Sequence, residues 1–108
     1  MYLVHARLGP ARDTGLPSDA AALVRRCAQP RDGVEFVVAH PEVRGGPVFG
    51  IFLLAPSLEL AESSAERVCL RALSRYPAFR GFALLSCAVA MPRAYFEKLF
   101  EESGEPPG

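Results

Sequence analysis

The segment at residues 48–55, VFGIFLLA, consists of seven apolar residues and a glycine, and it contains no polar side chain. Strands at the surface of a small domain usually alternate apolar and polar side chains, because one face meets the core and the other meets water. The segment at 82–91, FALLSCAVAM, is also apolar on both faces. Two such strands need a cover on each side of their sheet, and this need constrains both the fold and the assembly of the chain.

The composition is that of a single globular domain. A length of 108 residues with 50% hydrophobic residues predicts one core, which we place in residues 1–102, followed by a flexible tail at 103–108. Twelve basic and twelve acidic residues give a net charge of zero. A neutral chain has no overall field that attracts nucleic acid or anionic lipid, so we expect neither nucleic acid nor a membrane as a partner.

The cysteines and the first residues bear on localisation. Cys27, Cys69 and Cys87 are odd in number and share no short spacing, so they are interpreted as buried thiols in a reducing cytoplasm. The opening residues, MYLVHARLGP, lack the basic region of a secretory signal peptide. Both observations predict a cytoplasmic protein.

Residue patterns predict four strands and three helices. Alternation and β-branched residues indicate strands at 2–8, 34–43, 48–55 and 82–91. Apolar stripes at helical spacing predict helices at 18–29 with Ser18 as N-cap, at 58–75 with Ser57 as N-cap, and at 93–102. The element order is therefore β-α-β-β-α-β with an added terminal helix.

This order predicts an α+β sandwich. Two right-handed crossovers would place the helices 18–29 and 58–75 on one face of a four-stranded antiparallel sheet of order 4-1-3-2. The arrangement resembles the ferredoxin-like group, which includes dimeric barrels whose members range from monooxygenases to ligand-binding regulators. The resemblance rests on element order over residues 2–91, so no site residue is carried over from that group.

The second face of the sheet is the expected interface. Leu3, Val37 and Ala39 are predicted to join strands 48–55 and 82–91 in a wide apolar patch, which monomers rarely expose. The terminal helix and the sheet of a second subunit are the two possible covers. Ten residues of helix span only ~15 Å, so we expect a homodimer to which that helix contributes.

His5, Arg7 and Glu35 are the polar residues predicted on that open face. Strands 2–8 and 48–55 are expected to run parallel, with strand 34–43 against them, which would place Arg7 and Glu35 toward the same end. A hollow above Gly50 would then let the three side chains orient a small polar ligand. The favoured alternative is an Arg7–Glu35 pair at a dimer rim, with His5 hydrogen-bonded nearby.

Other chemical signatures are weak. Two distant histidines give no metal-ligand spacing, and no nucleophile elbow surrounds Ser86 or Cys87. We therefore expect no catalytic residue, no metal and no cofactor. A series of arginines at four-residue spacing is the best case for an acidic partner, although a solvated helix face is the preferred interpretation; it comprises Arg67, Arg71 and Arg75, with Arg25 and Arg26 on the neighbouring helix.

Two functional hypotheses follow. The favoured one is a small non-catalytic dimeric accessory or regulatory protein that acts through contacts with another protein. The alternative is metal-independent binding or turnover of a small apolar molecule between two facing sheets, with His5 as acid–base group, Arg7 as orienting cation and Glu35 as its counter-charge. A cavity of ~300 Å³ or more lined by His5 would favour the alternative, and a filled sheet face would favour the first.

Overall fold

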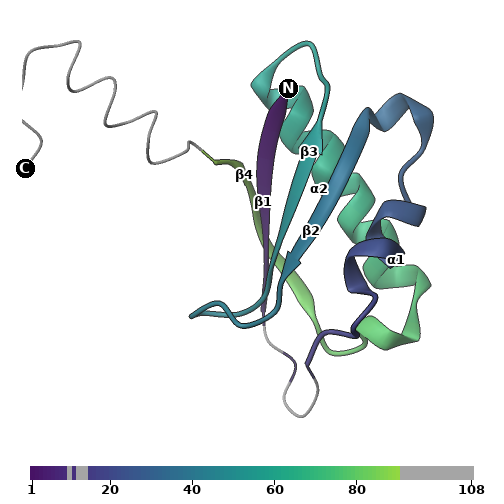
Figure 1. Ribbon diagram of the computed structural model, residues 1–108, viewed down its shortest axis with the longest axis vertical. Helices are drawn as coiled ribbons and strands as arrows, with labels where there is room; N and C mark the ends of the chain where they lie inside the picture. The colour runs from purple at the N-terminus through teal and green to yellow at the C-terminus, as the bar shows by residue number, and fades with distance from the viewer. Residues whose placement is uncertain (10, 12–14, 91–108) are drawn as a thin grey trace, which may run out of the picture.

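The computed structural model describes residues 1–9, 11 and 15–90 (Figure 1). Its elements are β1 (Tyr2–Gly9), α1 (Ala20–Arg26), β2 (Val34–His40), β3 (Val48–Leu53), α2 (Leu58–Arg75) and β4 (Ala83–Val89), with short 3₁₀ helices at Pro30–Asp32 and Pro77–Phe79. The predicted helix at 93–102 and tail at 103–108 lie outside the described residues.

The four strands form one antiparallel sheet of order β2-β3-β1-β4, and α1 and α2 lie on the same side of it (Figure 1). This confirms the α+β class, the central positions of β1 and β3, and the edge positions of β2 and β4. The expected parallel direction of β1 and β3 is wrong, because Tyr2 pairs with Leu53 and Arg7 with Val48. The α1 crossover makes β2 run parallel to β1, and the turn after β2 then reverses β3.

The core lies between the sheet and the two helices, with α2 packed against β1 and β3. Alternate residues of β1 and β3 are fully buried against small side chains of α2, which let this helix approach the sheet closely. Fully buried core residues include Val4, Leu8, Phe49, Ile51 and Leu53 on the sheet, Ala61, Ala65, Val68 and Ala72 on α2, and Phe79 in the 3₁₀ helix that follows α2.

The two helices begin differently. The Ser57 hydroxyl accepts a hydrogen bond from the Leu60 N–H at 3.2 Å, so the predicted N-cap of α2 is confirmed. The predicted cap of α1 is wrong: the residue before that helix is Asp19, whose side chain makes no capping hydrogen bond, and α1 has only seven residues. Because α1 is short, α2 makes most of the contacts between the helices and the sheet.

A one-residue bulge at Glu35 changes the faces of β2. Val34 pairs with Leu53 and Phe36 pairs with Phe52, so Glu35 has no direct partner on β3. The expectation that Val37 and Ala39 lie on the open face is wrong, because they pack into the core on the helix side. The extra residue shifts the alternation by one position, which moves Phe36, Val38 and His40 to the open face.

The chain itself covers much of the second face of β3. The side chain of Val48 is only 7% exposed and Gly50 is buried. A Cβ atom at Gly50 would lie 2.9 Å from Val38 Cγ2 and 3.5 Å from Leu3 Cδ1, so side chains of both neighbouring strands close over this glycine. The expected hollow above Gly50 is therefore wrong, and the exposed apolar surface is narrower than the sequence indicates.

Gly33 forms the junction between the Pro30–Asp32 helix and β2. It has φ +69°, and its carbonyl oxygen accepts a hydrogen bond from the Leu54 N–H at 2.9 Å. A Cβ atom at this position would collide with the Leu54 carbonyl oxygen. Both the backbone conformation and the close approach therefore require glycine.

We expect Gly33→Ala to lower the free energy of unfolding by about 2 kcal/mol or more, because it adds left-handed strain to a backbone collision. Urea denaturation followed by circular dichroism measures the change. Gly15→Ala is the matched control, since a Cβ atom at Gly15 would have no neighbour within 4 Å among the described residues. Equal unfolding midpoints for the two variants would show that the Gly33–Leu54 approach is not a constraint.

Candidate functional site

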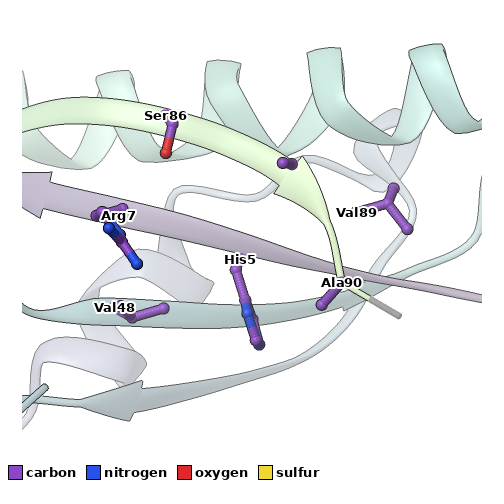
Figure 2. A pocket seen from close by; sticks show the side chains of 7 residues that line it. His5, Arg7, Val48, Ser86, Val89 and Ala90 are labelled. Atoms are coloured by element: carbon purple, nitrogen blue, oxygen red, sulfur yellow. The ribbon is translucent and has the colours of Figure 1, made fainter. Parts of the chain in front are cut away.

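A hollow of about 210 Å³ lies on the open face of the sheet, at the junction of β1 and β4 (Figure 2). Its described walls come from His5 and Arg7 on β1, Val48 on β3, and Ser86 with residues 88–90 at the end of β4. The hollow therefore contains two of the three site residues that the sequence predicts.

Strand register brings the polar groups of the hollow together. His5 and Arg7 are two residues apart on β1, so both side chains project from the same face of the sheet (Figure 2). Arg7 pairs with Ser86 across the strand boundary, and His5 pairs with Ala88. The Ser86 hydroxyl consequently lies beside Arg7, a proximity that only the register of β4 against β1 reveals.

Arg7 also reaches toward the loop between β2 and β3. Its Nη1 atom lies 3.9 Å from the point where a side chain at Gly45 would begin. Arg7 also pairs with Val48 on the neighbouring strand, and a side chain opposite that valine is consistent with its low exposure. The Arg7 side chain therefore covers part of β3 and also places a positive charge at the hollow.

Glu35 lies away from the hollow. It sits in the bulge between the Val34–Leu53 and Phe36–Phe52 pairs, whereas Arg7 pairs with Val48 at the opposite end of β3. The antiparallel direction of β1 and β3 separates the two charges, so the expected Arg7–Glu35 proximity within one chain is not formed. The described walls of the hollow consequently carry hydrogen-bond donors and no carboxylate.

The predicted arginine series has an acidic partner inside the same chain. Asp32 is fully buried, and its two carboxylate oxygens lie 3.3 Å from Arg67 Nη2 and 3.3 Å from Arg71 Nη1. Arg71 also donates to the Cys27 carbonyl oxygen. Asp32 gave no signal in the sequence analysis, because its contact with the arginines spans more than thirty residues of chain.

The hydrogen bonds around Asp32 keep it ionised. Burial by itself raises the pKa of the carboxyl group, but the Gln29 N–H, which donates at 2.8 Å, and the guanidinium groups of Arg71 and Arg67 outweigh that effect. The pKa of Asp32 is therefore below its ordinary value of 3.8. The cluster is a structural clamp between the Pro30–Asp32 helix and α2.

The cysteine thiols differ in accessibility. Cys27 and Cys69 are buried, as predicted, whereas Cys87 is half-buried because β4 is an edge strand. Contact with Cys87 and burial raise the pKa of the Cys69 thiol far above its ordinary value. Cys69 is therefore a protonated thiol of the core and a poor nucleophile.

No family model, curated protein or solved structure matches this chain. Among residues 1–9, 11 and 15–90, His, Cys, Asp and Glu do not gather in groups of three or more that could hold a metal ion. Neither α1 nor α2 is long and apolar enough to cross a membrane. The geometry of the described site is thus the basis for functional inference.

We expect Asp32→Asn to lower the free energy of unfolding at neutral pH by about 1–3 kcal/mol, because two guanidinium groups lose their counter-charge. The expected loss of stability is modest because the side chains of Arg67 and Arg71 are 48% and 28% exposed, so solvent screens both ion pairs. Asp32 has a lower pKa in the folded chain than in the unfolded chain. Its stabilisation is therefore present above the unfolded pKa and is lost as pH falls through the folded pKa.

Urea denaturation from pH 7 to pH 2 tests this expectation. The difference in stability between the parent chain and Asp32→Asn should shrink in the acid range as Asp32 becomes protonated. Asp19→Asn is the control, because Asp19 is exposed and makes no ion pair with a described residue. A constant difference across the whole pH range would refute the assignment of the clamp to an ionised Asp32.

A thiol reagent under native conditions should modify Cys87 before Cys27 and Cys69, because only Cys87 is partly accessible. Mass spectrometry of time points, with Cys87→Ser as the reference, measures the order of modification. Early modification of Cys69 would contradict its position in the core.

Proposed function

We propose that this chain is a small non-catalytic accessory or regulatory protein, which forms a homodimer through the open sheet face and acts through contacts with another protein. We also infer the ferredoxin-like topology for it, supported by central β1 and β3 and by two helices on one face of the sheet. The three free cysteines support a location in the reducing cytoplasm.

An exposed aromatic patch carries the proposal. Phe36 is 56% exposed, and its ring centroid lies 5.8 Å from that of Phe52. Phe52 pairs with Leu3 on β1, so these three residues, called the Phe36 patch below, form an apolar row across the open face. Phe36 is exposed, whereas Phe52 and Leu3 are half-buried. Aromatic side chains contribute strongly to the energetics of protein interfaces, so an exposed ring backed by two apolar neighbours supports a contact surface.

The size of the face limits the strength of the dimer. Four strands at a spacing of ~4.8 Å, each with about seven residues at ~3.3 Å, give a projected area of roughly 440 Å². A standard interface buries about 800 Å² of accessible surface on each partner, so even a rough sheet face lies toward the small end of stable interfaces. We therefore propose a dimer whose population depends on concentration.

The small-molecule alternative has less support. The hollow of about 210 Å³ is below the ~300 Å³ at which drug-sized ligand sites begin, and much of the space above β3 is filled by its neighbours. Glu35 is too far along the sheet to serve as the counter-charge of Arg7. Turnover of an apolar substrate by His5, Arg7 and Glu35 within one chain is therefore disfavoured.

Phe36→Glu should convert a dimer of twice 11.7 kDa into a monomer, because it places a charge at the most exposed residue of the Phe36 patch. Sedimentation equilibrium over a concentration series measures the mass. Leu70→Glu is the control, since Leu70 is similarly exposed, at 46%, but lies on α2 on the other side of the sheet. A parent chain that remains a monomer at every concentration would overturn the proposed dimer.

A further inference from the structure

The positive charge of Arg7 at the hollow has no counter-charge among the described residues. Arg67 and Arg71 are paired with Asp32, but Arg7 forms no ion pair with any residue that the structure describes. The displacement of Glu35 to the far end of the sheet removes the counter-charge that the sequence analysis assigned to Arg7. An anionic ligand would supply this missing counter-charge.

The donors of the hollow are placed to share one anion. Arg7 and Ser86 face each other on adjacent antiparallel strands, a position in which Cβ atoms are typically about 5 Å apart. His5 is the next residue of β1 on the same face, and Figure 2 shows its ring and the Arg7 guanidinium projecting in the same direction. A planar carboxylate can accept two hydrogen bonds from a guanidinium group and one from a neighbouring hydroxyl.

The remaining walls are apolar and set the size of the ligand. Ala88 lies opposite His5, Ala90 lies past Ala88 toward the end of β4, and Val48 lies opposite Arg7 on β3. A volume of about 210 Å³ equals roughly seven water molecules at liquid density, so it suits a molecule with about that number of non-hydrogen atoms. An inorganic anion would use only the polar part of this space.

We infer that the hollow binds the carboxylate of a short organic acid. Arg7 and Ser86 donate to the carboxylate oxygens, His5 flanks them, and the hydrocarbon part of the acid lies against Ala88 and Ala90. This inference goes beyond the proposed dimer and does not depend on it, because the hollow lies at the β1–β4 side of the open face and the exposed ring of Phe36 lies on β2.

Binding of isovalerate, a short branched acid of suitable size, tests the inference on the full chain. Isovaleramide has the same shape without the charge and serves as the ligand control. Isothermal titration calorimetry should show saturable binding of the acid at millimolar concentration and binding of the amide at least about tenfold weaker, as expected for loss of a charge-assisted hydrogen bond. Amide NMR spectra of the labelled chain should shift at His5, Ser86 and Ala88.

Substitutions locate the site and separate it from the dimer. Arg7→Gln should raise the dissociation constant for isovalerate by about tenfold or more, whereas Arg25→Gln, at an exposed arginine of α1, should leave it within about twofold. Phe36→Glu should retain acid binding even where it abolishes the dimer. Absence of saturable binding, equal binding of acid and amide, or unchanged binding by Arg7→Gln would each overturn the inference and leave the test of the dimer unaffected.

Discussion

The bulge at Glu35 is the local feature on which the open face of the sheet depends. Without the extra residue, β2 would present Val37 and Ala39 to the open side and would remove them from the core. With it, Val38 closes over Gly50 and Phe36 emerges beside Phe52. One unpaired residue at an edge strand therefore decides which side chains cover β3 and which remain exposed, since a shift by one position exchanges the two faces of a strand.

The open face consequently has two ends with different chemistry. The Phe36 patch occupies the end where β2 and β1 begin, and His40, Arg7 and Ser86 occupy the other end. Apolar contact favours association at the first end, whereas charge favours an anion at the second. We propose that this face combines a weak self-association with recognition of a small acid, and we expect separate substitutions to alter the two activities.

On the helix side of the sheet, arginines of α2 form contacts with other groups of the same chain. Asp32 draws Arg67 and Arg71 toward the Pro30–Asp32 helix, and Gln29 completes the set of donors around its carboxylate. The guanidinium of Arg75 lies over the ring of Tyr76, with its Cζ atom 5.6 Å from the ring centroid. The arginine series of α2 therefore contributes mainly to internal contacts, and its regular spacing is not a measure of affinity for an acidic partner.

The amino-acid sequence by itself determined the class, the order of the elements and the central positions of β1 and β3. These features follow from local periodicity, caps such as Ser57 and the right-handed crossover, and each is specified by residues near one another in the chain. It also identified His5 and Arg7 as polar residues of the open face.

Tertiary structure alone decided the direction of β1 against β3, the bulge at Glu35, the pairing of Arg7 with Ser86 and the clamp at Asp32. Each of these depends on the register of strands or on contacts between distant segments, where a shift of one residue reverses the outcome. Register is set by the packing of the whole core, and no short stretch of sequence encodes it. That is why the sequence indicated His5 and Arg7 but missed Ser86 and wrongly placed Glu35 beside Arg7.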